Sequence, residues 1–100
     1  LTAYGRRAPF GDWVGFGDEV ALAGGLFVQR EDGRPEFIAD AVADPLTGIF
    51  AALAVVNLVQ GEASGLLDLS LFAVVSHCLQ KIHCGGGQVN HEYLRPNLRC

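Results

Sequence analysis

Carboxylates at the start of an apolar segment are the first candidates for chemistry in this 100-residue chain. Asp44 is followed by Pro45 and then by a long apolar run, and Asp40 lies four residues earlier. An Asp followed by a Pro fits a helix N-cap and first helical residue, because the N–H that Pro lacks would have no helical partner there. From these residues alone Asp44 is interpreted as a cap worth about 1 kcal/mol, with a nucleophilic carboxylate as the alternative. Asp40 is predicted to be a solvated loop carboxylate.

Histidines and cysteines in the last quarter of the chain form a second candidate set. The residues are His77, Cys78, His83, Cys84, His91 and Cys100, and Zn²⁺ takes four such N or S donors. Zinc ligands usually lie two to four residues apart on a turn, whereas adjacent residues on a helix point about 100° apart. We therefore expect no metal, with a metal-binding module kept as an alternative. An odd number of cysteines without framework spacing predicts reduced thiols.

Three helices are predicted around Asp44. A helix beginning at Pro45 and running to residue 59 would be apolar around nearly its whole circumference, so it is predicted to be buried against a sheet. Asp18 is predicted to cap a short helix over residues 18–23, which two glycines end. Ser70 is predicted to cap a second apolar helix over residues 71–82.

Strands are predicted in two short apolar segments, residues 1–4 and 66–69, and the charged residues 29–36 are predicted to form a solvated loop. Helix, tight turn, strand and helix in this order are typical of α/β proteins, in which parallel strands are covered on both faces. We therefore predict an α/β architecture, followed by an irregular tail over residues 84–100.

Composition narrows the classes of partner. The net charge is −4 and the seven Lys and Arg residues form no run, so nucleic acid is not expected. The longest apolar run, residues 49–56, is far shorter than the roughly 20 residues that span a bilayer, and no signal segment is evident, so we predict a soluble, cytoplasmic protein without a membrane partner. Half of the residues are hydrophobic, which suggests that partner segments cover part of the surface.

Three segments, in order, carry a resemblance to a known family. They are residues 4–10 with 15–18, residues 43–55, and residues 61–65 with 67–71. Together they resemble the family III CoA-transferases, which include formyl-CoA transferase, the carnitine and bile-acid CoA-transferases and α-methylacyl-CoA racemase. The most specific part is the step from Ala43-Asp44 through Thr47-Gly48 into an Ala-rich helix. Family members are several times longer, so the resemblance implies that residues 1–83 are an internal piece of the larger, Rossmann-like parallel-sheet domain, with most CoA-binding segments upstream.

The resemblance gives Asp44 a role. It implies a nucleophile that takes the acyl group of an acyl-CoA as a mixed anhydride and then carries CoA as an aspartyl thioester to a second carboxylic acid. Acyl-CoA is a substrate in this scheme, and no prosthetic group is implied. The full-length parent is expected to be an interlocked homodimer, and the isolated chain is expected to show no turnover.

Within the family, transferase is favoured over racemase. The racemase branch uses a His in the segment aligned with residues 15–18, where this chain has Phe16, and no His precedes His77. Some transferases have a basic residue near the position of Val14 that contacts the CoA phosphates, and a Val cannot do this. Arg6 and Arg7 could bind phosphate, but they are predicted to be solvated loop cations. Residues 85–88 are predicted to form a flexible linker, because they are rich in glycine. No P-loop Lys follows the glycines, so nucleotide binding has no support. A noncatalytic remnant or interaction module is the alternative from another functional class.

Overall fold

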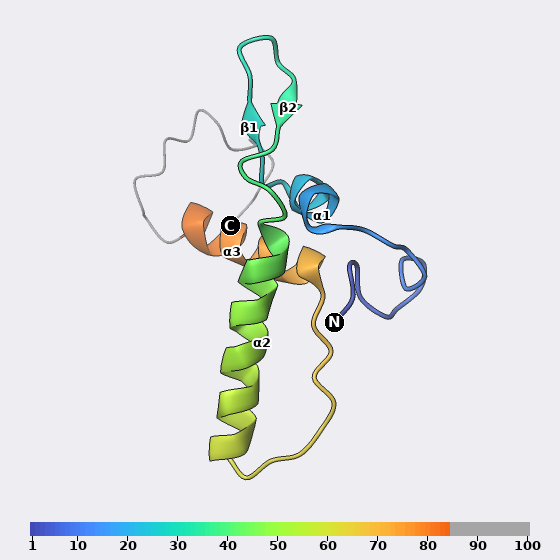
Figure 1. The fold of residues 1–100 in the computed structure, drawn as a ribbon, viewed down its shortest axis with the longest axis vertical. Coiled ribbons are helices and arrows are strands. Elements are labelled where there is room, and N and C mark those ends of the chain that lie inside the picture. The colour runs from blue at the N-terminus through green and yellow to red at the C-terminus, as the bar shows by residue number, and fades with distance from the viewer. Residues whose placement is uncertain (85–100) are drawn as a thin grey trace.

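The computed structural model describes residues 1–84, so most of the predicted tail, with the predicted linker, lies outside the described residues. Five elements follow one another along the chain (Figure 1): α1 (Gly17–Gly24), β1 (Val28–Gln29), β2 (Pro35–Glu36), α2 (Ala43–Gln60) and α3 (Leu71–Cys84). This mixture of helices with a small amount of strand is loosely α/β, which agrees with the predicted fold class in its broadest sense.

A small core lies where α1, α3 and the start of α2 meet. In α3 the buried residues Leu71, Val74, Val75 and Leu79 recur with the spacing of one helix face. Leu71, Val75 and Leu79 pack with Val20 and Ala21 of α1, and Ala43 joins the same cluster from α2. Apolar spacing therefore predicted α3 well, and the helix runs two residues beyond the predicted end.

The predicted strands at residues 1–4 and 66–69 meet at one point. The Thr2 N–H donates to the Leu69 carbonyl at 3.0 Å, and the Leu71 N–H donates to the Thr2 carbonyl at 3.0 Å. The result is a single parallel bridge between Thr2 and Ser70 rather than a pair of strands. Within residues 1–84 the structure therefore has no parallel sheet of Rossmann type.

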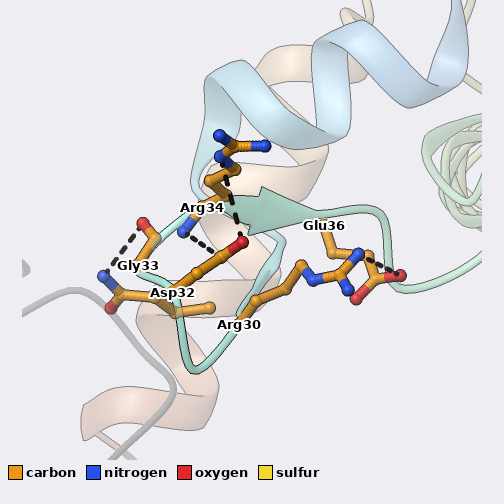
Figure 2. A network of polar contacts seen from close by, with 6 residues as sticks. Arg30, Asp32, Gly33, Arg34 and Glu36 are labelled. Atoms are coloured by element: carbon orange, nitrogen blue, oxygen red, sulfur yellow. Dashed lines mark hydrogen bonds and ion pairs between the residues drawn. The ribbon is translucent and has the colours of Figure 1, made fainter.

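The segment predicted as a solvated loop is a short antiparallel hairpin. β1 pairs with β2 in the register Val28 with Glu36 and Gln29 with Pro35, and all of these residues are exposed. Figure 2 shows the charged side chains around its tip, where Arg30 lies 3.8 Å from Glu36 and Arg34 lies 3.9 Å from Asp32. The Asp-Gly pair at the tip is a strong hairpin signal, so the sequence contained this element. The exposure of this segment to solvent was predicted correctly, but the pairing of β1 with β2 was not predicted.

The predicted burial of the long apolar helix is wrong for the described residues. Only Ala43 and Thr47 of α2 are buried, and beyond Phe50 the helix extends away from α1 and α3 (Figure 1). Large apolar side chains are exposed along it: Ile49, Leu53, Val55, Val56 and Val59. The physical reason is that no described sheet covers them.

Helix α2 is also long and apolar enough, by length and composition, to cross a membrane, a property shared with core helices of soluble proteins. The whole helix is 18 residues long. The prediction that the protein has no membrane partner considered only the longest apolar run within it, residues 49–56. This observation leaves the expected cellular location untested.

Candidate functional site

The N-termini of α1 and α2 meet through a hydrogen bond between two residues that are 23 positions apart in the sequence. Asp18, in the first turn of α1, accepts a hydrogen bond through Oδ1 from the backbone N–H of Ala41. Ala41 has a positive φ of 48° and begins the turn into α2. The Asp18 carboxylate therefore caps the approach to α2, and its predicted role as N-cap of its own helix is wrong. Helix α1 begins one residue before Asp18.

Local capping of α1 falls to other residues. Phe16 is the N-cap, and Glu19 reaches back so that its Oε2 accepts from the Phe16 N–H at 3.1 Å. At the other end, Gly25 adopts a left-handed conformation with φ 96°, and its N–H donates to Leu22 O at 3.0 Å. The predicted glycine stop is confirmed, because this C-cap conformation is open to Gly at little cost.

Asp44 lies inside the first turn of α2 rather than at its cap. The N-cap is Val42, so the helix begins two residues earlier than the Asp44-Pro45 pair predicted. The Asp44 N–H donates to Ala41 O at 3.0 Å, and Pro45 still lies among the first residues, whose N–H groups need no helical partner. Asp44 and Asp40 are both exposed, as predicted for Asp40.

The carboxylate of Asp44 lies directly against the backbone of Gly17, the first residue of α1. A Cβ added to Gly17 would overlap Asp44 Oδ2 and would come within 2.9 Å of both Cα and O of Ala41. Because the first N–H groups of a helix have no carbonyl partner within it, this carboxylate lies beside the positive ends of two helix dipoles. The Asp44 carboxylate and the start of α1 are therefore direct neighbours.

Gly17 and Ala41 were not recognised as site residues in the sequence. Gly17 falls within one segment of the family resemblance and Asp44 within another, and the structure brings these two segments into contact. Crowding around a missing Cβ becomes visible only in three dimensions, so the sequence signal was limited to a glycine next to the acidic start of a helix.

Two pockets flank α3. The first, the arginine pocket, has a volume of about 290 Å³ and is lined by Arg6 and Arg7 together with Tyr4, Asp68 and Ser70 among others. The second, the apolar pocket, has a volume of about 380 Å³ and lies between α2 and α3. Asp44 lines neither of these two pockets. Arg6 and Arg7 are exposed, as expected of loop cations, and they also share a concave surface.

The histidines and cysteines give no metal cluster among the described residues. No group of three or more His, Cys, Asp or Glu side chains within residues 1–84 could hold a metal ion, and His91 and Cys100 lie outside that range. Cys78 is a free thiol, whereas Cys84 is disulfide-bonded. The prediction of reduced thiols is therefore wrong at Cys84, because an odd cysteine count still permits one pair and one free thiol.

Comparison of the chain with protein-family models, with curated proteins and with solved structures finds no match in any of the three. The resemblance to family III CoA-transferases therefore stays a prediction.

Proposed function

We propose that Asp44 is the nucleophile of a CoA-transferase of family III type, which moves CoA between carboxylic acids. The observation that supports this most is the contact of the Asp44 carboxylate with Gly17, where two helix N-termini meet. A carboxylate that attacks a thioester has to be ionised and accessible. Asp44 is exposed, which provides access, and it lies beside N–H groups that have no helical partner.

The proposed reaction first acylates Asp44 and then attaches CoA to it, and one carboxylate oxygen of Asp44 is exchanged in each turnover. The Asp44 carboxylate attacks the carbonyl carbon of an acyl-CoA, the C–S bond breaks, and a mixed anhydride forms with release of CoA thiolate. The thiolate then attacks the Asp44 carbonyl, which releases the first carboxylic acid as its anion and leaves an aspartyl-CoA thioester. A second carboxylate takes CoA from Asp44 by the reverse sequence, and Asp44 is regenerated as a carboxylate.

Helix N-termini also suit the charge that develops during these steps. Each tetrahedral intermediate carries a negative oxygen, and backbone N–H groups at a helix start are donors for such an oxygen. We propose that the free N–H groups at the start of α1 serve in this way when the carbonyl carbon of Asp44 is attacked. Gly17 then has a functional reason to lack a side chain, since a Cβ there would overlap the carboxylate.

The remaining features of the proposal follow the family resemblance. The chain would be part of a Rossmann-like domain of a cytoplasmic, interlocked homodimer, in which the sheet and the partner subunit cover the apolar surface of α2. The parallel bridge between Thr2 and Ser70 fits such a sheet, because parallel pairing across a long crossover is typical of α/β domains. Acyl-CoA and a carboxylic acid are the proposed substrates, with no metal and no nucleic acid.

Hydroxylamine trapping tests the role of Asp44. The full-length parent is incubated with short acyl-CoA donors, from acetyl-CoA to succinyl-CoA, and the reaction is quenched with hydroxylamine. Hydroxylamine converts an aspartyl anhydride or thioester into a hydroxamate. Peptide mapping by mass spectrometry is expected to find the hydroxamate at Asp44. Asp44→Asn should abolish it, whereas the matched control Asp40→Asn should retain it.

Two outcomes would count against the proposal. A hydroxamate on another carboxylate, or one that survives in Asp44→Asn, would assign the nucleophile elsewhere. Absence of any hydroxamate, with binding of CoA also absent, would favour a second candidate function.

The second candidate is a noncatalytic interaction module. The exposed apolar side chains of α2 favour it, because a face of this kind on a soluble protein marks a protein contact. Asp44 would then act only in the packing of α1 against α2. Isothermal titration with CoA separates the two candidates, since the interaction module has no reason to bind the nucleotide.

A further inference from the structure

The apolar pocket between α2 and α3 carries an inference that goes beyond the proposed chemistry at Asp44. Its walls come from three parts of the chain, and most of them are hydrocarbon or aromatic. They are Leu26 after α1, Leu46 and Phe50 of α2, and Val75, Leu79 and Ile82 of α3. Small-molecule sites are typically concave, mainly apolar and about 300 to 1,000 Å³ in volume, so a pocket of about 380 Å³ lies at the small end of that range.

The polar groups of the pocket all come from α3. Lys81 is the one side chain with a permanent charge among the lining residues, and it forms no ion pair with any residue in the described part of the chain. His77 also lines the pocket, and its ring lies edge-on to Phe50 with centroids 5.8 Å apart. An apolar cavity with a cation at its wall and no carboxylate among its lining residues complements an apolar molecule with an anionic head.

We propose that this pocket binds a small monocarboxylic acid, with its apolar body between Leu46, Phe50 and Ile82 and its carboxylate at Lys81. The volume has room for roughly a dozen non-hydrogen atoms, taking about 30 Å³ for each water-sized unit. An aromatic body suits the wall because two rings, Phe50 and His77, are among the lining residues. Lys81 gives the site its preference for anions over alcohols and amines.

Cys78 supplies a reporter inside the pocket. It is a free, partly buried thiol that lines the cavity, so a bound ligand should shield it from thiol reagents. The test measures the rate at which N-ethylmaleimide modifies Cys78 in the full chain, under non-reducing conditions and by peptide mapping. Three probes of matched shape are compared: phenylbutanoate, phenylbutanol and phenylbutylamine.

The expected order of protection is phenylbutanoate, then phenylbutanol, with phenylbutylamine weakest. Lys81→Met should weaken protection by phenylbutanoate about fivefold, the upper end for a solvent-exposed ion pair, and should leave phenylbutanol unchanged. Arg30→Met is the matched control, because it removes a cation from the exposed hairpin and should change neither probe. The comparison within each variant keeps the test independent of overall stability.

Equal protection by the acid and the amine would overturn the proposal, as would an unchanged preference in Lys81→Met. No protection by any probe at millimolar concentration would show that the pocket takes no such ligand. Protection that rises with protein concentration alone would assign the pocket to a second copy of the chain and would also overturn the proposal. The assay does not involve Asp44, so its failure leaves the proposed transferase chemistry to its own test.

Discussion

Replacing Gly17 by alanine is expected to force the N-termini of α1 and α2 apart. The new Cβ would overlap Asp44 Oδ2, and rotation of the Asp44 side chain could relieve that contact. It would also lie within 2.9 Å of Cα and O of Ala41, and backbone atoms cannot rotate away. Overpacking of this kind costs about 1 to 3 kcal/mol, and part of it is offset by the better helix propensity of alanine, worth at most about 1 kcal/mol. A net loss of about 1 to 2 kcal/mol in the free energy of unfolding follows.

Gly48→Ala is the matched control for this substitution. Gly48 lies in the body of α2, and a Cβ there would have no neighbour within 4 Å. The same chemical change should therefore raise the free energy of unfolding by about 0.5 to 1 kcal/mol through helix propensity alone. The two Gly→Ala variants are thus expected to shift stability in opposite directions.

Urea unfolding followed by circular dichroism measures both variants. The midpoint should fall for Gly17→Ala and rise for Gly48→Ala, with the dependence on urea unchanged in each. A double variant, Gly17→Ala with Asp44→Ala, should recover part of the loss, because it removes the side-chain overlap and keeps the backbone one. If Gly17→Ala proved neutral or stabilising, the close approach of Asp44 to α1 would be refuted, together with the proposed role of the N–H groups of α1.

Three further predictions concern the same elements. Asp18→Ala removes the acceptor for the Ala41 N–H and should cost about 1 to 2 kcal/mol in urea unfolding, whereas Asp18→Asn, which keeps an acceptor oxygen, should cost clearly less; equal costs would contradict the capping role. Ser70→Ala removes the bond from the Ala73 N–H at 3.1 Å and should lower the midpoint by the equivalent of about 1 kcal/mol, with Ser70→Asp close to wild type. Leu53→Lys, on the exposed face of α2, should change the unfolding free energy by less than about 0.5 kcal/mol and reduce self-association in sedimentation velocity; a loss above about 2 kcal/mol would show that this face is buried in solution.

Local signals predicted the helices well where the capping partner lies close in sequence. Ser70 caps α3 as predicted because its Oγ reaches an N–H three residues on. Asp18 and Asp44 were each predicted to cap their own helix. Asp18 instead accepts from the Ala41 N–H, just before α2 begins, and Asp44 lies inside the first turn of α2. Contacts of that kind depend on how helices pack, and no pattern within a single helix records them.

Burial and strand pairing were the least predictable features. The apolar circumference of α2 predicted a covered helix, yet composition states only that such a surface needs a partner and does not say which segment provides it. The strand propensity of residues 1–4 and 66–69 led to a single bridge, because a strand exists only where a neighbour supplies continued hydrogen bonds. The same reasoning explains the candidate site: Asp44 was identified from sequence, and its neighbour Gly17 was identified from the packing.

The hairpin of β1 and β2 occupies much of the stretch that joins α1 to α2, and its tip is exposed and closed by local backbone hydrogen bonds. Exposed tips of this kind tolerate nicks and insertions well, and a longer connection adds little closure entropy. The polypeptide could therefore be divided between Asp32 and Gly33 into two separately expressed halves. Their reassembly would then report, without any chemistry, on how strongly the halves that carry Gly17 and Asp44 recognise each other.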